Sequence, residues 1–225
     1  MIIDCISDLH GHYPTLEGGD LLIVAGDLTA SDQHHQYEEF FIWLSKQDYR
    51  KKVFISGNHD NQGMSQFDWH DYEWSEVDYL KDSGTKFEGL NIWGSPWTRT
   101  FEGMNPHCKA FTCETDVELN DKWKLIPENT DILITHCPPW GIQDSTGNSK
   151  RIGSFSLLEK FNRKRFNPKL HVFGHLHEGY GVYKKKVILR LKPQFSIKEV
   201  GCKFVNASHV NEIYQPINKP IRMTL

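Results

Sequence analysis

The sequence predicts an α/β fold built around a largely parallel sheet. Short segments of β-branched and aliphatic residues alternate along the chain with segments that have the periodicity of amphipathic helices. Apolar runs this short and this continuous are typical of strands buried on both faces, as in parallel sheets covered by helices. Right-handed crossovers keep the successive strands of such a pattern parallel. We therefore expect the carboxyl ends of the strands to meet at one edge, where α/β proteins bind ligands.

Five predicted strands each stop directly before polar residues. In chain order they are residues 2–6, 21–25, 53–55, 132–134 and 170–173. The polar segments that follow them are Ser7-Asp8, Gly26-Asp27, Ser56-Gly57-Asn58-His59-Asp60, Thr135-His136 and Gly174-His175. Because these strand ends are expected to share one edge, we expect the polar side chains to converge there.

Two helical patterns lie between the strands. In the first, apolar side chains recur at i, i+3, i+4 and i+7, at Tyr37, Phe40, Phe41 and Leu44. The second places Phe155, Leu158 and Phe161 on one face behind Ser154, which we expect to cap the helix. Both spacings are those of amphipathic helices that cover a sheet.

After His177 the pattern changes to strand-like pieces with little helical period. These pieces are Gly181–Tyr183, Val187–Leu189 and Lys203–Asn206. They predict a second, more antiparallel sheet packed on the first. Because no linker composition separates the two parts, we expect one domain over residues 1–225. The basic run at residues 184–186 is interpreted as a solvated edge.

Composition excludes several classes of protein. The chain has 26 Lys plus Arg against 29 Asp plus Glu, a net charge of −3, which argues against a polybasic nucleic-acid binder or a cationic membrane peptide. Five cysteines without a C-x-x-C pair fit neither a disulfide framework nor a thiolate zinc site, and they favour a reducing compartment. With no secretory pattern at residues 1–10 and no window of 18 uncharged apolar residues, we expect a cytoplasmic protein without membrane contact.

The residues after the five strands have the chemistry of metal ligands. The side chains of Asp8 and His10 are two positions apart, so an extended chain directs them to the same side. Glycine precedes both Asp27 and Asn58, which lets the backbone approach an ion closely. The candidate ligands are two carboxylates, one amide oxygen and four imidazoles: Asp8, His10, Asp27, Asn58, His136, His175 and His177.

Seven donors are too many for one ion with an open position, but they suit two ions about 3.5–4 Å apart bridged by a carboxylate. Two divalent ions with two carboxylates leave a net positive site, which attracts a phosphate ester. Nitrogen and oxygen donors without thiolate favour Mn, Fe or Zn over Mg, Ca or Cu(I).

Other catalytic motifs fail a direct check. The sequence has no P-loop, dinucleotide-binding, nucleophile-elbow or H-E-x-x-H motif. Cys137 next to His136 suggests a nucleophilic thiol, but two prolines follow it and a metal already explains the histidine.

The motifs resemble those of a known family. Asp8-x-His10, Gly26-Asp27, Gly57-Asn58-His59-Asp60, His136 and Gly174-His175-x-His177, in this order, are similar to the five blocks of the calcineurin-like metallophosphoesterases. Residues 93–97, 131–142, 171–181 and 206–208 resemble the small subgroup of metallophosphoesterase-domain-containing proteins. The resemblance covers nearly the whole chain.

The resemblance implies a four-layer αββα sandwich of two mixed sheets flanked by helices, with a dinuclear site that acts on phosphodiesters. For the subgroup it implies weak hydrolysis of cyclic nucleotides. The implied ligands of the first ion are Asp8, His10, Asp27 and His177. Those of the second are Asp27, Asn58, His136 and His175, so Asp27 bridges the two, and His59 is the non-ligand histidine near the leaving group.

Two features depart from the subgroup. Some members have glycine in place of His175, which weakens the second ion, whereas this chain keeps the histidine. The stretch at 184–203 is longer than the subgroup needs, which predicts a hairpin insertion.

We therefore expect a phosphodiesterase that uses two divalent ions, with Mn favoured for activity. A hydroxide bridging the ions would attack phosphorus, His59 would be the general acid and Asp60 would orient it. Trp97, Arg99 and Trp140 are candidates to bind a small phosphoester such as a cyclic nucleotide. The alternatives are a phosphomonoesterase or protein phosphatase, a nuclease, and a non-catalytic scaffold on the same fold; no oligomeric state is predicted.

Overall fold

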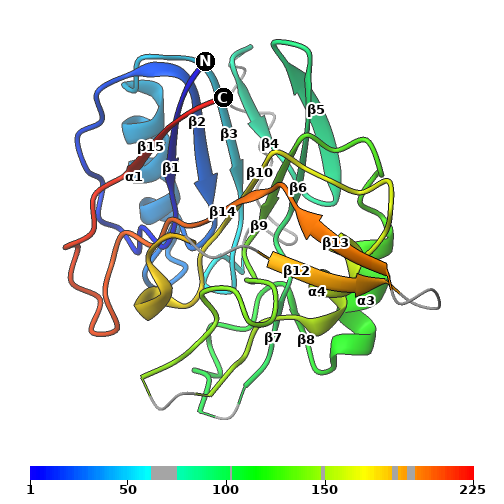
Figure 1. Cartoon of the computed structure of the whole chain (residues 1–225). Coiled ribbons are helices and arrows are strands. Elements are labelled where there is room, and N and C mark those ends of the chain that lie inside the picture. Colours follow the sequence, from blue (N-terminus) through cyan, green and yellow to red (C-terminus); the bar gives the residue numbers. More distant parts are fainter. Residues whose placement is uncertain (62–74, 102, 148–149, 184–186, 192–195) are drawn as a thin grey trace.

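Two β-sheets pack face to face in the computed structural model (Figure 1), which describes residues 1–61, 75–101, 103–147, 150–183, 187–191 and 196–225. The first sheet has the order β15-β1-β2-β3-β4. Its strands are β1 (Ile2–Ile6), β2 (Gly19–Ala25), β3 (Tyr49–Ile55), β4 (Val77–Tyr79) and β15 (Ile221–Thr224). Strands β1 to β4 pair in parallel, and β15 pairs with β1 in the antiparallel direction.

The second sheet has six strands in the order β11-β14-β10-β9-β6-β5. They are β5 (Ser83–Phe87), β6 (Leu90–Ser95), β9 (Ile132–Thr135), β10 (Leu170–Phe173), β11 (Gly181–Val182) and β14 (Lys203–Asn206). The four central strands are parallel, and the two edge strands are antiparallel to their neighbours.

Two short pairs lie outside these sheets. Strand β7 (Thr98–Arg99) pairs with β8 (Thr112–Cys113) in parallel. Strands β12 (Val187–Leu191) and β13 (Ser196–Val200) form an antiparallel hairpin. They lie within residues 184–203, where the comparison with the subgroup predicts an inserted hairpin. The basic run at 184–186 lies outside the described residues.

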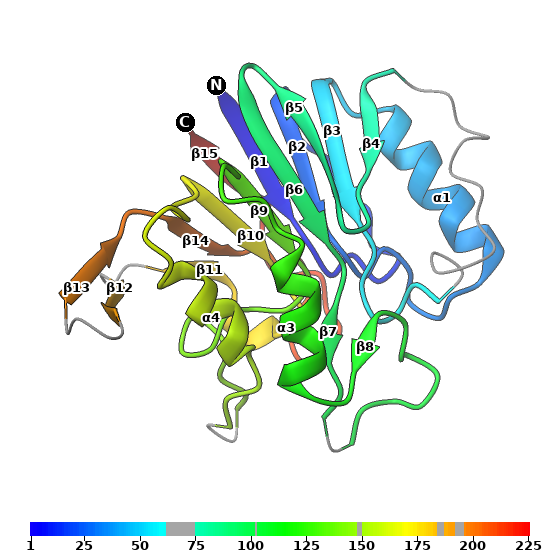
Figure 2. The same ribbon diagram turned by 90° about the vertical axis from the view of Figure 1, so that its right-hand side faces the viewer.

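The five predicted strands all form, but they do not share one sheet. Three of them are β1, β2 and β3 of the first sheet, and two are β9 and β10 of the second. Their continuous apolar runs reflect burial on both faces, one against the opposite sheet and the other against helices. All five still end at the same edge of the sandwich, because the two sheets run in similar directions (Figure 2).

The predicted second sheet after His177 is wrong in its membership. Strand β14 joins β10 in parallel with Val172 opposite Val205, and β15 completes the first sheet. Phe204 and Val205 are buried on opposite faces of β14, so this strand needs cover on both sides. Only a place inside the six-stranded sheet provides that cover.

Among the described residues, three α-helices cover the outer faces, in agreement with the four layers implied by the resemblance (Figure 2). Helix α1 (His34–Ser45) covers the first sheet and buries the predicted apolar face, with the Phe40 ring 5.3 Å from that of Phe54. Helices α3 (Asp116–Lys124) and α4 (Phe155–Phe161) cover the second. Among the described residues, no helix has the length and apolar character needed to cross a bilayer.

The cap of α4 is as predicted, but its buried face is not. The Ser154 hydroxyl accepts a hydrogen bond from the Leu157 N–H. Leu157 and Phe161 are buried, whereas Phe155 is 53% exposed. A helix of two turns has few apolar positions, so the packing of Phe161 against Phe166 and Phe204 sets its rotation.

Candidate metal centre

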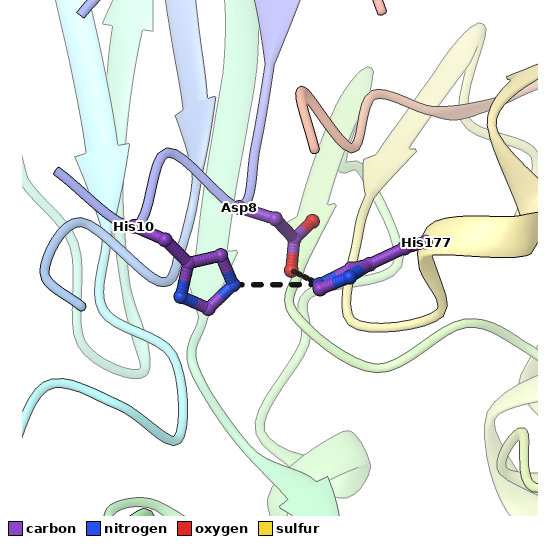
Figure 3. A group of neighbouring side chains, drawn as sticks. All are labelled: Asp8, His10 and His177. Carbon is purple, nitrogen blue, oxygen red and sulfur yellow. Dashed lines mark hydrogen bonds and ion pairs between the residues drawn. The ribbon is translucent and has the colours of Figure 1, made fainter. Parts of the chain in front are cut away.

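The first group of candidate ligands joins the two sheets. Asp8 and His10 follow β1, and His177 opens the short 3₁₀ helix η2 (His177–Gly179) after β10. The Nε2 atom of His177 lies 3.4 Å from Oδ1 of Asp8 and 3.4 Å from Nε2 of His10. Figure 3 shows the three side chains pointing at one another although 167 positions separate His10 from His177.

The second group is centred on Asp27. Its Oδ2 atom lies 3.7 Å from Nε2 of His10 and 3.3 Å from Nε2 of His136. The same His136 nitrogen is 3.0 Å from Oδ1 of Asn58, and its ring centroid is 5.0 Å from that of His175. Asp27 therefore stands between the two groups, and His175 is joined to the cluster by a ring contact.

Three overlapping triads of side chains could each hold a metal ion. Within each triad, the potential ligand atoms lie within 4.8 Å of one another. The triads are Asp8–His10–His177, Asp8–Asp27–His136 and His10–Asp27–His59. Asp8, His10 and Asp27 each belong to two of them, so the three triads form one connected cluster. The donors are carboxylates and imidazoles without thiolate, which fits divalent Mn, Fe or Zn.

Glycines beside the ligands leave no room for a side chain. A Cβ atom on Gly26, where φ is +100°, would lie 2.6 Å from Nδ1 of His136. One on Gly57 would collide with the Asp27 carboxylate, and one on Gly174 with the Asp8 carboxylate. These three glycines are therefore needed for the close approach of the donors.

Four of the seven candidate ligands have a left-handed backbone. The φ angles are +52° at Asp8, +44° at His10, +52° at Asp27 and +69° at His175. Asp and His enter this region more readily than most residues, yet such conformations still cost about 1–3 kcal/mol when strained. Strain of this kind gathers at functional sites, where the surrounding structure enforces it.

A second layer of hydrogen bonds orients the ligands. The Ser208 hydroxyl donates to Oδ2 of Asp8 over 2.8 Å. The Nδ1–H groups of His136 and His177 donate to the carbonyl oxygens of Ala25 and Asn211, each over 3.0 Å. These bonds leave the Nε2 atoms of both histidines facing the cluster, as in metal sites whose imidazoles are held by carbonyl groups.

The carboxylates and imidazoles shift each other's pKa values. Burial by itself would raise the pKa of Asp8, but the hydrogen bond and charge of His177 outweigh it and hold that pKa low. Asp27 behaves in the same way through His136. Burial lowers the pKa of His136, yet the charge of Asp27 and the hydrogen bond to it raise the net value to about 9. A cation entering this site therefore displaces a proton from His136.

Two other histidines of the cluster are held neutral. Burial is the largest effect on His10 and His175 and lowers the pKa of each to about 3. A neutral imidazole is the form that binds a metal ion, so both rings are ready to do so at neutral pH.

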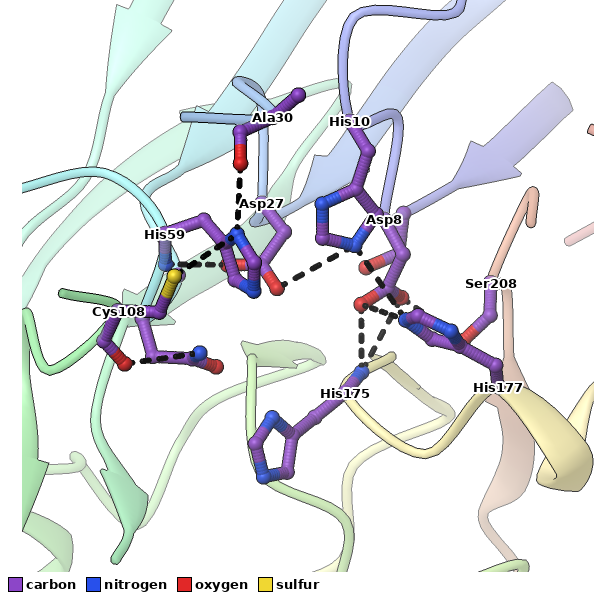
Figure 4. Close-up of polar contacts among 12 residues, drawn as sticks. Asp8, His10, Asp27, Ala30, His59, Cys108, His175, His177 and Ser208 are labelled. Carbon is purple, nitrogen blue, oxygen red and sulfur yellow. Dashed lines mark hydrogen bonds and ion pairs between the residues drawn. The ribbon is translucent and has the colours of Figure 1, made fainter. Parts of the chain in front are cut away.

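His59 stands beside the donors with a separate set of contacts (Figure 4). Its backbone N–H donates to Oδ1 of Asp27 over 2.9 Å, and its ring centroid is 4.5 Å from that of His10. The Nδ1 atom lies 3.1 Å from the Ala30 carbonyl oxygen and 3.4 Å from the Cys108 sulfur. These contacts hold Nδ1 on the Ala30 and Cys108 side, while the ring still supplies a nitrogen to the triad with His10 and Asp27.

The structure corrects the predicted role of Asp60. Its buried carboxylate accepts hydrogen bonds from the backbone N–H groups of Leu28, Thr29 and Gly57 at 2.8–3.1 Å. The His59 ring instead contacts Ala30 and Cys108. Adjacent residues on a tight turn point in different directions, so Asp60 ties the loops after β2 and β3 together and does not orient the imidazole.

The three candidate substrate residues also have other partners. The Trp97 indole N–H donates to Oδ2 of Asp82 over 2.7 Å, and Lys122 Nζ lies 3.7 Å from the centre of its ring. Arg99 is exposed on β7, and the Trp140 backbone N–H donates to the Ser154 carbonyl. None of the contacts described for these three residues reaches the candidate ligands.

Sequence reasoning missed several residues at the site. Ser208 stood inside a recognised motif, but nothing there indicated its bond to Asp8. Cys108 and Tyr214 lie beside His59 in space and carry no motif. Their placement depends on loops whose path is set by tertiary packing.

Comparison with known proteins agrees with the motifs. The family model for calcineurin-like phosphoesterase matches residues 1–179. Metallophosphoesterase domain-containing protein 1 of Homo sapiens is 34% identical over 98% of this chain and 70% of its own length, as is that of Mus musculus. A UPF0046 protein of Caenorhabditis elegans is 31% identical over 96% of this chain and 58% of its own.

A solved structure supports the fold. It superposes with a TM-score of 0.58 at 14% identity and covers 91% of this chain and 89% of its own. At that identity, the likeness concerns the arrangement of sheets and helices.

Proposed function

The chain belongs to the calcineurin-like phosphoesterase family, and from this premise we propose that it is a dinuclear-metal phosphodiesterase acting on small substrates such as cyclic nucleotides. The observation that carries the proposal is the convergence of two carboxylates, an amide and four imidazoles from five strand ends. Their number and the overlap of the triads suit two ions better than one.

Each side of the cluster supplies one set of ligands in this proposal. Asp8, His10 and His177, shown in Figure 3, would hold one ion together with Asp27, and Asn58, His136 and His175 would hold the other with the same carboxylate. When bound, the ions activate water at neutral pH and neutralise charge on the phosphoester. Mn, Fe and Zn all fit the donors, and we expect Mn to support activity best.

His59 is proposed as the proton donor to the leaving oxygen. Its Nδ1–H group is directed at the Ala30 carbonyl, which fixes the ring and leaves Nε2 to deliver a proton from the imidazolium form. The backbone N–H of the same residue holds Asp27, so the donor and the proposed bridging carboxylate keep a fixed relation.

The electrostatics favour diesters over monoesters. The ion pairs described for Asp8 and Asp27 are made with histidines. A phosphomonoester dianion carries more charge than a diester and gains most from a Lys or Arg clamp. A singly charged diester suits a site where, among the described ion pairs, no Lys or Arg pairs with Asp8 or Asp27.

Activity on small esters tests this proposal. The protein is loaded with Mn²⁺ and given bis-p-nitrophenyl phosphate and p-nitrophenyl phosphate in parallel. We expect faster cleavage of the bis ester. A preference for the monoester would favour a phosphomonoesterase or protein phosphatase, and an inert protein that retains no metal would favour a scaffold. A panel of 2′,3′- and 3′,5′-cyclic nucleotides against short single-stranded DNA then separates a cyclic-nucleotide phosphodiesterase from a nuclease.

The role of His59 has its own test. His59→Ala should keep two ions per chain and lose about 10²–10⁴-fold in turnover on esters with poor leaving groups. Loss on a p-nitrophenolate ester should be far smaller, because that leaving group needs no proton. Equal losses on both would remove the general-acid role, and loss of one ion would make His59 a ligand.

A further inference from the structure

A half-exposed tyrosine lies against the proposed catalytic cluster. The ring of Tyr214 is 4.8 Å from that of His10 and 5.3 Å from that of His177, centroid to centroid, and both contacts are edge-to-face. Its distance to the His59 ring is 6.2 Å. Because 49% of Tyr214 is exposed, part of this ring is open to a ligand.

The loop after β14 holds this ring in place. Tyr214 has a φ of +61°, a strained conformation for an aromatic residue. The Asn211 side chain accepts hydrogen bonds from the N–H groups of Ile213 and Gln215, and the Tyr214 N–H donates to the Asn211 carbonyl over 2.9 Å. That carbonyl also accepts from Nδ1 of His177. The position of the ring is therefore tied to a candidate metal ligand.

We propose that Tyr214 binds the leaving group of the substrate by stacking against its nucleobase. This inference rests on the proposed function and names the substrate class more closely, as a nucleotide diester. An aromatic face stacks any base, because every base has a π-face. A ring held by its loop also loses little entropy when a ligand binds.

The leaving-group side is chosen because of His59. A group that takes a proton from His59 leaves beside that imidazole, and Tyr214 is an aromatic neighbour of it. Phe101, another exposed ring among the described residues, contacts His175 at a centroid distance of 5.8 Å, on the side of the second set of ligands. A base attached through its sugar to the leaving oxygen is therefore directed toward Tyr214.

Calorimetric titration of the Mn-loaded protein tests the assignment without turnover. The probes are adenosine 5′-monophosphate, which has a base, and inorganic phosphate, which has none. Tyr214→Ala should weaken binding of the nucleotide by about 5- to 100-fold, the range expected for one base stacked on one ring. Binding of phosphate should stay unchanged, and Tyr214→Phe should bind both probes like the wild type.

Ile213→Ala is the matched control, because Ile213 is 65% exposed on the same loop. It should bind both probes normally. Melting temperature and Mn content of Tyr214→Ala must match the wild type, which excludes a general loss of structure. If Tyr214→Leu restores nucleotide binding in full, bulk and not stacking is responsible, and the proposal is overturned.

Three further outcomes are distinguishable. Equal losses for nucleotide and phosphate in Tyr214→Ala would make the tyrosine a support for the ligands and overturn the inference, even if the protein cleaves diesters. A base-specific loss in Phe101→Ala in place of Tyr214→Ala would also overturn it. Base-specific binding through Tyr214 in a protein that cleaves no diester would uphold the subsite and refute the proposed function.

Discussion

Two aspartates on the same strand segment have opposite surroundings. Asp4, inside β1, accepts two hydrogen bonds from the guanidinium of Arg222 at 2.9 and 2.7 Å and another from Tyr49. Asp8, just past the end of β1, is paired with His177 and Ser208. Arginine stays charged at every physiological pH, whereas histidine can give up its proton. The charge of Asp4 is therefore neutralised permanently, and that of Asp8 is available to a cation.

The two edges of the sandwich also differ in what they contain. The edge where the parallel strands begin has a cavity of about 520 Å³, lined in part by Leu90, Pro168 and Lys203. Lys203 there donates to the Thr224 carbonyl, an ordinary surface contact. The opposite edge has the buried donors and the left-handed backbone. The candidate metal ligands therefore lie at the edge with the left-handed backbone, and the 520 Å³ cavity lies at the opposite edge.

The largest effect is expected from Asp27→Asn. We predict that Mn-dependent turnover falls by more than about a thousandfold, since the variant loses the carboxylate shared by both sets of ligands. Asp4→Asn is the matched control: it removes an equally buried carboxylate and should keep both ions and full turnover. Metal analysis and initial rates measure both. Comparable losses in the two variants would erase the contrast between Asp4 and the carboxylates of the candidate site.

Loss of the Asp60 carboxylate should act on stability. Asp60→Ala leaves the buried N–H groups of Leu28, Thr29 and Gly57 without their acceptor. At about 1–3 kcal/mol for an unsatisfied group, with partial relaxation, the free energy of unfolding should fall by about 2–5 kcal/mol. Urea denaturation of the metal-free protein measures the change. His59→Ala at the next position should be far milder, and equal destabilisation would contradict the bracing role.

Much of the site could be read from the sequence, because it depends on local patterns. A glycine before Asp27 or Asn58 and the alternation of His175 and His177 are local, and the strand ends bring them to one edge. The roles of Asp60 and Trp97 were not readable, since the direction of a side chain in a turn depends on distant partners. The left-handed backbone of the ligands leaves no sequence signal apart from the residue types that tolerate it.

The fold shows the same division. Short apolar runs predicted the strands correctly, because burial on both faces leaves a continuous pattern. Their distribution between two sheets was not readable, since a strand buried against helices and one buried against a second sheet have the same pattern. The place of β14 beside β10 is likewise a long-range pairing that β14 itself does not encode.

A smaller effect is expected from Ser208→Ala. The variant loses the hydroxyl that donates to Oδ2 of Asp8 and should bind Mn²⁺ about 10- to 100-fold more weakly, as is usual when a hydrogen bond to a metal ligand is removed. Titration with Mn²⁺ followed by calorimetry gives the affinity. Unchanged affinity would show that His177 and the His175 backbone N–H are enough to hold Asp8.

An effect of comparable size is expected from a change of pH. Because the pKa of His136 is raised to about 9 without metal, binding of an ion at neutral pH releases a proton. Affinity for Mn²⁺ should therefore rise between pH 6.5 and 8.5, by up to about tenfold per pH unit for each proton released.

The metal-free fold should show the opposite trend. The ordinary value of His136 is 6.5, so its protonated form stabilises the metal-free protein fully below that pH, and this contribution is lost as the pH rises through about 9. The protons that Mn²⁺ binding releases are counted by calorimetry of metal binding in two buffers of different ionisation enthalpy. Metal binding without proton release would contradict the pairing of His136 with Asp27.

Anomalous diffraction from crystals of the Mn-loaded protein measures the central feature most directly. We expect two manganese peaks about 3.5–4 Å apart with the Asp27 carboxylate between them. Asp8, His10 and His177 should surround one peak, and Asn58, His136 and His175 the other. A single peak, or a pair that Asp27 does not bridge, would contradict a dinuclear centre built from both sheets.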